Sequence, residues 1–303
     1  MKKIDNKQTV ENLRNLIKEY ILKSKVKSLV LGISGGIDSA IVAVLVKPIV
    51  DELGIPLIGR SITIESNSED EQDRAREIGK HFCTDFQEVN LTEQYKIMKE
   101  FDNMEGDCDD DVIYKIRMGN IKARMRMIYL YNLASRNNGL VLGTMNESEH
   151  NLAYFTLCGD EAADFEPIIS LWKTEIYDMA SYLVDEEDDN EKAVALNRCI
   201  LCNATDGLGI SNTDLDQILP DWKNRHNSTR SGYEEVDNIL IDYLQLVKKL
   251  MDKTCQLNYK NNLIVQEKVL KLNNHPVIKR YIKYSFKRNH PYIIHRNDII
   301  KII

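Results

Sequence analysis

The sequence has no long hydrophobic segment and is poor in cysteine, proline and glycine. No stretch approaches the ~20 consecutive apolar residues that span a bilayer, so we expect no membrane helix. The lysines at positions 2 and 3 are not followed by an apolar segment, which argues against a secretory signal. Six cysteines scattered over 303 residues favour reduced thiols in a cytoplasmic protein over a disulfide framework.

The chain also lacks an excess of cations, since 40 lysines and arginines face 47 aspartates and glutamates, for a net charge of −7. This balance argues against nonspecific nucleic-acid binding as the main activity. Hydrophobic residues make up 43% and charged residues 29%, which is typical of a soluble globular protein. No repeat or flexible linker divides the sequence. We therefore expect one domain over residues 1–303, with a sheet core at about 25–184 and a mostly helical part at about 185–303.

Short apolar segments alternate with amphipathic segments through the first half of the chain. We expect strands at residues 28–33, 55–64, 86–89 and 140–143. We expect helices at residues 9–23 with Thr9 as N-cap, 37–53 with an end or kink at Pro48, 68–82 and 110–137. Acidic stretches at 107–111 and 185–191 indicate solvated loops or helix starts. The alternation predicts an α/β, Rossmann-like fold whose parallel sheet is covered by helices on both faces.

The strongest local signal is the glycine loop at residues 32–39 (GISGGIDS), between an expected strand and an expected helix. Gly35 and Gly36 let the backbone approach a ligand closely, and the amides together with the helix N-terminus form an anion site. Mg²⁺ held between Asp38 and phosphates explains most simply why a carboxylate stands beside a phosphate site. The loop is neither a Walker A loop nor a G-x-G-x-x-G motif, and the alternative is a glycine turn without a ligand.

The S-G-G-x-D-S sequence of this loop resembles the pyrophosphate-binding loop of the ATP pyrophosphatases, which cleave ATP between the α- and β-phosphates. Two further segments, residues 119–127 (GNIKARMRM) and 143–149 (GTMNESE), are similar to motifs of the NAD synthetases within that group. The spacing of the same family is kept at Tyr154, Phe155, Thr156, Gly159, Asp160, Ala163, Asp164, Pro167, Lys173, Thr205 and residues 233–237. The resemblance extends over nearly the whole chain.

The resemblance implies the reaction of the ammonia-dependent NAD synthetases. In that reaction ATP adenylates the nicotinate carboxylate of deamido-NAD and releases pyrophosphate, and ammonia then displaces AMP to give NAD. The implied partners are ATP as co-substrate, deamido-NAD and ammonia, with Mg²⁺ as cofactor. Such chemistry needs neutralised phosphate charge and two aligned nucleotides, which a protein supplies by positioning and electrostatics.

The resemblance also assigns roles to residues. It makes Asp38 and Glu149 the magnesium ligands, and it gives catalytic roles to Asp38, Lys173 and Asp164. The implied ATP-binding residues are Gly32, Ile33, Ser34, Gly35, Gly36, Ile37, Asp38, Ser39, Arg60, Thr144, Lys173 and Thr205. The implied deamido-NAD-binding residues are Asn120, Arg124, Tyr131, Asp164, Phe286 and Lys287. Tyr131 lies seven residues after Arg124 on one helix face and could stack on the nicotinate ring, but core packing explains an aromatic at this spacing equally well.

Three positions around the dinucleotide depart from the family pattern. Leu157 replaces a lysine, Phe286 replaces a histidine, and Ile116 stands where some relatives place a nicotinate-stacking aromatic. The ATP positions are kept better than the deamido-NAD positions. We therefore expect the dinucleotide to sit differently or to bind more weakly, with Lys287, Arg288 or His290 as candidate replacements for the missing cation.

Two further patterns carry weaker signals. Cys199 and Cys202 form a C-x-x-C pair without a second pair, so we expect packed thiols rather than a zinc or redox site. The basic and aromatic segment at 279–292 could bind single-stranded nucleic acid, but closure over the dinucleotide phosphates is favoured. The resemblance further implies a homodimer, and ammonia that arrives free or from a separate protein. The alternatives are an RNA-modifying ATP pyrophosphatase and a non-catalytic adenine-nucleotide sensor.

Overall fold

The computed structural model describes residues 3–65, 67–102, 111–205, 210–251 and 259–290. In this part of the chain, parallel strands form a four-stranded sheet in the order β3-β2-β1-β4. The strands are β1 (Ser28–Gly32), β2 (Leu57–Thr63), β3 (Asp85–Asn90) and β4 (Gly139–Leu142). The chain extends the sheet from β1 to β3 on one side and then adds β4 on the other side of β1. Ligands of open parallel sheets bind at such a reversal, beyond the carboxyl ends of the strands.

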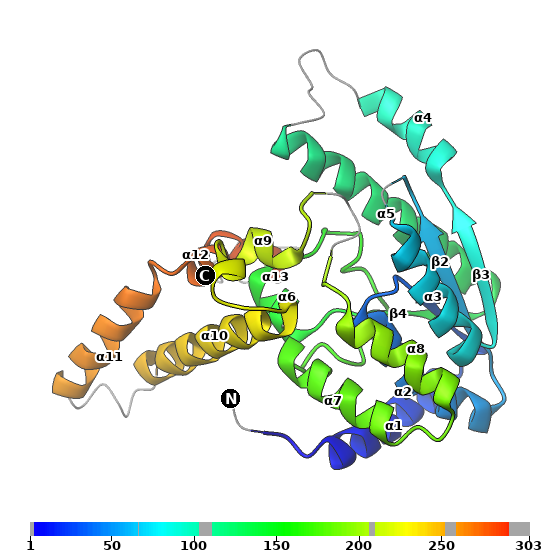
Figure 1. Ribbon diagram of the computed structural model, residues 1–303, viewed down its shortest axis with the longest axis horizontal. Coiled ribbons are helices and arrows are strands. Elements are labelled where there is room, and N and C mark those ends of the chain that lie inside the picture. Colours follow the sequence, from blue (N-terminus) through cyan, green and yellow to red (C-terminus); the bar gives the residue numbers. More distant parts are fainter. Residues whose placement is uncertain (1–2, 66, 103–110, 206–209, 252–258, 291–303) are drawn as a thin grey trace, which may run out of the picture.

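Successive residues of β1 pack on two different helical layers, which confirms the expected α/β fold (Figure 1). Leu29 and Leu31 join a core with helices on one face, whereas Val30 packs with Ala134 of the helix on the other face. The first layer contains α1 (Asn6–Ser24), α2 (Ile37–Leu53), α3 (Glu69–Phe82), α7 (Lys173–Asp185) and α8 (Asn190–Leu201). The second layer contains α5 (Val112–Arg136), with α4 (Thr92–Asp102) beside it. A strand buried on both faces needs the continuous apolar run that β1 has.

Several boundaries differ from those expected. The side chain of Asp5, and not Thr9, caps α1 by accepting a hydrogen bond from the Gln8 amide. The helix α2 does not end at Pro48 but reaches Leu53, the last residue expected for it, because the buried side chains around the proline supply more stability than the lost hydrogen bond removes. The helix α4 follows β3 and was not expected from the sequence.

The chain beyond residue 170 is mostly helical, as expected. After the short α6 (Glu147–Leu152) and the helices α7 and α8 come α9 (Asp214–Ile218), η1 (Trp222–Asn224), α10 (Thr229–Met251), α11 (Tyr259–Leu272), α12 (Pro276–Lys283) and α13 (Ser285–Arg288). A second apolar cluster joins α6, α9, α10 and α12, while α10 and α11 extend away from the sheet (Figure 1). Within the described ranges, no helix is long and apolar enough to cross a membrane.

The acidic stretches were expected to be loops or helix starts, and this is confirmed for their described residues. Asp185 ends α7 and Asp189 caps α8, so the stretch at 185–191 is a loop and a helix start. Asp111 caps α5, and residues 107–110 lie outside the described ranges.

Candidate active site

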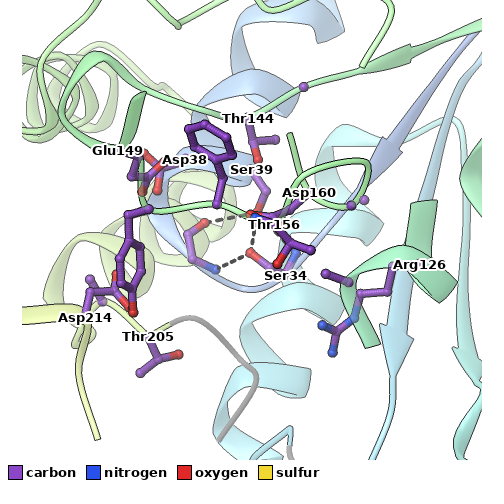
Figure 2. A pocket seen from close by; sticks show the side chains of 18 of the residues that line it. Ser34, Asp38, Ser39, Arg126, Thr144, Glu149, Thr156, Asp160, Thr205 and Asp214 are labelled. Carbon is purple, nitrogen blue, oxygen red and sulfur yellow. Dashed lines mark hydrogen bonds between the residues drawn. The ribbon is translucent and has the colours of Figure 1, made fainter. Parts of the chain in front are cut away.

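The glycine loop turns tightly between the end of β1 and the start of α2 (Figure 2). The amides of Ser34 and Gly36 donate to the hydroxyl oxygens of Ser39 and Ser34, each over 3.2 Å. Gly35 has a left-handed φ of 82°, and a Cβ at this position would lie 2.3 Å from the carbonyl oxygen of Glu71 in α3. Only glycine therefore fits, as expected for a loop that must approach another backbone closely.

The helix α3 packs against the glycine loop and forms a hydrogen bond to it. Arg74 is buried, with 6% of its surface exposed, and its Nε donates to the Gly35 carbonyl oxygen over 2.8 Å. A carbonyl oxygen turned into an anion site would repel phosphate, and this bond instead holds the Gly35 carbonyl oxygen against the guanidinium of Arg74. Thr205 Oγ1 donates to Glu71 Oε1 over 2.6 Å, which fastens a further predicted ATP residue to the same helix. Sequence reasoning missed Arg74, because one arginine in a charged helix carries no distinguishing signal.

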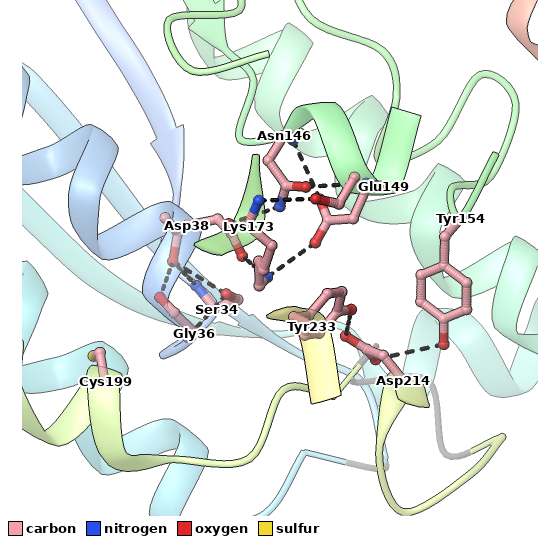
Figure 3. Close-up of polar contacts among 12 residues, drawn as sticks. Ser34, Gly36, Asp38, Asn146, Glu149, Tyr154, Lys173, Cys199, Asp214 and Tyr233 are labelled. Carbon is pink, nitrogen blue, oxygen red and sulfur yellow. Dashed lines mark hydrogen bonds and ion pairs between the residues drawn. The ribbon is translucent and has the colours of Figure 1, made fainter. Parts of the chain in front are cut away.

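A charged centre lies beside the loop, where α2, α6 and α7 meet (Figure 3). Lys173 Nζ lies 2.5 Å from Asp38 Oδ2 and 3.1 Å from Glu149 Oε1, and only 2% of the lysine is exposed. The Nδ2 of Asn146 donates to Asp38 Oδ1 over 2.9 Å, while its Oδ1 accepts from the Glu149 amide as the N-cap of α6. Asn146 was not predicted, although the N-x-x-E spacing within residues 143–149 is a capping-box signal.

The charges of this centre do not balance, because two carboxylates share one ammonium group. Burial raises the pKa of Glu149 to about 8, and the nearby Asp38 adds to the shift while Lys173 opposes it. Burial works against the charge of Lys173, but the two carboxylates outweigh it and raise the lysine pKa well above its usual value. The raised pKa of Glu149 means that a second negative charge is unfavourable in this centre, so a bound cation would favour the ionised form of Glu149.

Two carboxylates on facing elements suit Mg²⁺, which proteins usually hold through one or two carboxylates together with substrate phosphates. Asp38 and Glu149 both offer hard oxygen donors beside the predicted pyrophosphate loop. The described residues contain no cluster of three or more acidic, histidine or cysteine side chains that could hold a metal without a substrate. The donor set thus fits a cation that arrives with ATP.

A buried aspartate of α10 forms hydrogen bonds to residues next to the charged centre. Asp237 is fully buried and accepts hydrogen bonds from Ser148 Oγ over 2.5 Å and from the Thr174 amide and hydroxyl over 3.0 and 2.8 Å. Ser148 in turn accepts from the Lys173 amide over 2.8 Å. Asp237 therefore connects the start of α7 to α6. It fixes Ser148, the residue before Glu149, and Thr174, the residue after Lys173. Its position ends the block at residues 233–237 that the sequence singled out.

A cavity of about 570 Å³ joins the loop, the charged centre and the C-terminal helices, a volume that suits a small-molecule site. It is lined by most of the predicted residues, namely Gly32, Ile33, Ser34, Gly36, Ile37, Asp38, Ser39, Arg60, Asn120, Arg124, Thr144, Glu149, Lys173, Thr205, Phe286 and Lys287. Thr144, Thr156 and Asp160 surround the loop in Figure 2, with Asp214 and Thr205 nearby. The structure therefore brings the two predicted nucleotide sites into one cavity.

Three predicted residues, Gly35, Tyr131 and Asp164, do not line this cavity. Tyr131 packs against the cluster of Val30, Ile58 and Val141 on the sheet, and the carboxylate of Asp164 accepts from the Val141 amide over 2.8 Å. Burial, helped by the neighbouring Asp164, raises the pKa of Tyr131. This placement supports the packing interpretation of Tyr131 and leaves the assigned roles of Tyr131 and Asp164 as predictions.

Other predicted cations are already engaged. Arg60 lines the cavity, but its guanidinium pairs with Asp85 Oδ2 over 2.8 Å and donates to the Gly59 carbonyl over 2.7 Å. Arg124 donates from Nε to the carbonyl oxygen of Leu157 over 3.2 Å. Asn120 Oδ1 accepts from Thr156 Oγ1 over 2.8 Å. Substrate contact by Arg60 would therefore require its bonds to be shared or replaced.

The cysteine pair occupies the end of α8. Cys199 is fully buried, and Cys202 Sγ lies 3.2 Å from the Cys199 carbonyl oxygen. Burial raises the pKa of the Cys199 thiol to about 12. An un-ionised thiol is a poor nucleophile and metal ligand, which agrees with packed cysteines.

Comparison with known sequences points to one family. The sequence model of the NAD synthase family matches residues 9–291. The NH(3)-dependent NAD(+) synthetase of Finegoldia magna is 36% identical over 245 residues, covering 80% of this chain and 88% of that protein. The corresponding Campylobacter jejuni enzyme is 35% identical over 217 residues, which is 71% of this chain and 83% of that protein.

Solved structures share the fold. The NMN synthetase of Francisella tularensis aligns with a TM-score of 0.68 at 21% identity, covering 97% of this chain and all of that chain. The NH3-dependent NAD synthetase of Campylobacter jejuni aligns with a TM-score of 0.63 at 24% identity and the same coverage. With a match over nearly its whole length and an ATP-pyrophosphatase loop beside two carboxylates, the chain belongs to the NAD synthase family.

Proposed function

We propose that the chain is an ammonia-dependent NAD synthetase, a ligase that forms the amide of NAD from deamido-NAD, ammonia and ATP. One observation carries the proposal: Lys173 stands between Asp38 and Glu149 at the edge of the glycine loop. A loop of amides binds phosphate, and paired carboxylates beside it bind the cation that accompanies ATP. The NAD synthase match selects this reaction among those of the ATP pyrophosphatases.

The residues of the site divide the work by their chemistry. The loop amides and the first turn of α2 bind the phosphates of ATP, and Lys173 supplies a fixed positive charge as the bond between the α- and β-phosphates breaks. Mg²⁺, held by Asp38 and Glu149, would neutralise the charge that develops on the leaving pyrophosphate. Asn120 and Arg124 line the cavity on the α5 side, where they would align deamido-NAD so that its carboxylate meets the α-phosphate.

Ammonia is the nucleophile of the second step. Its attack on the acyl-adenylate forms the C–N bond, and the C–O bond to AMP breaks with its electron pair leaving on the phosphate oxygen. Asp160 lines the cavity and its carboxylate is suited to hold an ammonium ion or take its proton. We further propose that the enzyme works as a cytoplasmic homodimer, with ammonia taken from solution or from a separate donor.

The test is turnover by the purified protein with ATP, Mg²⁺, ammonium chloride and deamido-NAD. We expect NAD, AMP and pyrophosphate in equal amounts, and no AMP when deamido-NAD is omitted. Nicotinate mononucleotide offered in place of deamido-NAD tests whether the second nucleotide is needed for recognition. Absence of NAD at every ammonium concentration would remove the proposal.

The two alternatives predict different results in the same assay. An RNA-modifying ligase would turn ATP into AMP only when RNA is added, and a nucleotide sensor would bind ATP without making AMP. The buried Lys173 and its two partly buried partners, Asp38 and Glu149, argue against the sensor, because nucleotide binding alone does not require all three.

A further inference from the structure

Three cations of the C-terminal helices reach the same short stretch of backbone. Arg280 Nε donates to the Leu152 carbonyl over 3.1 Å, and a terminal nitrogen of Arg288 donates to the Asn151 carbonyl over 2.8 Å. Lys287 Nζ donates to the Ala153 carbonyl over 2.9 Å and also to the Phe155 carbonyl. These three side chains, here called the cationic clamp, therefore bind four carbonyl groups between residues 151 and 155.

This stretch begins in the last two residues of the helix that carries Glu149 and continues into the turn after it. The helix α6 has only six residues, and so short a helix is not stable by itself. Its last carbonyl groups lack partners within the helix and favour nearby cations. Asn146 caps the other end and also holds Asp38. Glu149 is thus held between a cap at its N-terminal side and the cationic clamp at its C-terminal side.

The turn after α6 also needs support because its backbone is strained. Ala153 has a left-handed φ of 49°, which costs energy for a residue with a Cβ and persists only where the surroundings enforce it. The Tyr154 amide donates to the Glu149 carbonyl over 2.9 Å, so the turn is bonded directly to the predicted metal ligand. The next residues, Phe155 and Thr156, line the cavity. A shift of the turn would therefore move Glu149 and the cavity wall together.

Lys287 is the member of the clamp that the sequence assigned to deamido-NAD. It lines the cavity and lies 4.5 Å from the centre of the Phe155 ring. Burial lowers its pKa to about 8, with Arg280 adding to the shift and Asp160 opposing it. Two carbonyl bonds and a ring contact already occupy much of its binding capacity, since an ammonium group has three donors.

We propose that Lys287, with Arg280 and Arg288, is a positioning residue that fixes Glu149 through the turn at residues 151–155, rather than a contact for deamido-NAD. The inference rests on the proposed function, in which Glu149 binds the Mg²⁺ of Mg·ATP. The clamp then links the C-terminal helices to the ATP half of the site. Substrate binding at the other half is not its main role.

The test compares Lys287→Met with Lys283→Met, a matched variant from the same segment. Lys283 is exposed and contacts the Tyr284 ring at 5.1 Å, without a hydrogen bond to the described residues 151–155. We expect Lys287→Met to weaken binding of Mg·ATP, measured by titration calorimetry, and to lower kcat, each by about 10-fold. The KM for deamido-NAD should change less than 3-fold, and Lys283→Met should resemble the wild type. Lys287→Arg should restore much of the binding, because it can still donate to both carbonyls.

The inference is wrong if Lys287→Met changes the KM for deamido-NAD and leaves Mg·ATP binding and kcat unchanged. A KM for deamido-NAD raised 10-fold or more, with Mg·ATP binding and kcat intact, would make Lys287 a substrate contact. Unchanged parameters in Lys287→Met would show that the clamp does not position Glu149. If Lys287→Met unfolds at the assay temperature, Arg288→Met provides the same comparison, because it removes the bond to the Asn151 carbonyl. The calorimetric measurement needs no turnover, so a wild type that binds Mg·ATP without making NAD would refute the proposed function and leave the clamp testable.

Discussion

Lys173 Nζ lies 2.5 Å from Asp38 Oδ2, although 135 residues separate them in the sequence. The contact joins the first turn of α2 to the first residue of α7. Both elements are fixed by the apolar core that they share. The ion pair is therefore placed by packing, and its own attraction only adjusts the final geometry.

Replacing the lysine should harm both stability and turnover. In Lys173→Met the carboxylates of Asp38 and Glu149 lose their buried counter-charge, which costs about 3 to 5 kcal/mol when one partner of a buried pair is removed. We expect this loss in urea unfolding at pH 7, together with a drop in kcat of at least about 100-fold. Lys173→Arg keeps the charge and should lose less stability than Lys173→Met. Equal stability of wild type and Lys173→Met would contradict a paired centre.

Replacing Arg74 should raise the KM for ATP and leave the KM for ammonium unchanged. Arg74→Gln removes the bond from Nε to the Gly35 carbonyl, and we expect the KM for ATP to rise about 10-fold, the equivalent of ~1.4 kcal/mol. The KM for ammonium should stay the same. Arg76→Gln is the control, since Arg76 pairs with Glu88 and Asp73 on the outer side of the same helix. An equal effect of both variants would show that only the charge of α3 matters.

The departure at Leu157 can be reversed. Leu157 lines the cavity and packs beside Met145 and Phe155. Leu157→Lys supplies the cation expected at this position from the family pattern and should lower the KM for deamido-NAD, while the KM for ATP stays unchanged. Leu157→Met controls for lost packing, because it keeps the apolar volume. An unchanged KM in Leu157→Lys would show that another residue already supplies the contact.

Asp237 should make stability depend on pH. Burial raises its pKa from 3.8 to about 6, so the folded state binds this proton more tightly than the unfolded state does. The resulting stability is full below pH ~4 and is lost as the pH rises through about 6. The difference in unfolding free energy between wild type and Asp237→Asn should therefore fall by up to about 1.4 kcal/mol per pH unit in this window.

Urea unfolding at pH 4.5, 5.5 and 6.5 measures this difference directly. Asp242→Asn, on the exposed part of the same helix, is the control and should follow the wild type. A constant difference between wild type and Asp237→Asn across the three pH values would refute the assigned titration.

The sequence predicted the parts of the site that depend on local pattern. The apolar run before the glycines is a strand, and the residues after them are a helix, because both signals lie within a few positions of one another. Glu149 and Lys173 were located only through the family motifs. Nothing near either residue in the sequence shows that they meet.

Helical spacing alone did not predict correctly which residues of α5 line the cavity. Asn120 and Arg124 both line the cavity, as their spacing of four residues suggested. Tyr131 shares their face but lies seven residues further along, which is about 10 Å at 1.5 Å per residue. At that distance the helix has left the cavity and packs on the sheet. Spacing indicates the face of a helix, while the neighbour at each turn depends on the tertiary fold.

Asn146 and Arg74 were missed for different reasons. The capping box at Asn146 could have been found from the spacing of residues 146 and 149. Arg74 acts through one bond to a carbonyl group 39 residues earlier in the chain. No local pattern encodes such a contact.

The wide separation of the residues that meet in the turn after Glu149 also matters while the protein is being made. Lys287 and Ala153 are 134 positions apart, so a growing chain holds its nucleotide loop long before the C-terminal helices leave the ribosome. At roughly 5 to 20 residues per second, the interval from residue 39 to residue 288 is on the order of 10 to 50 seconds. During this time the strands can pair, but an unfinished chain has no complete site with which to spend ATP. The bonds from Arg280, Lys287 and Arg288 to the turn after Glu149 therefore form only after the C-terminal helices have been made.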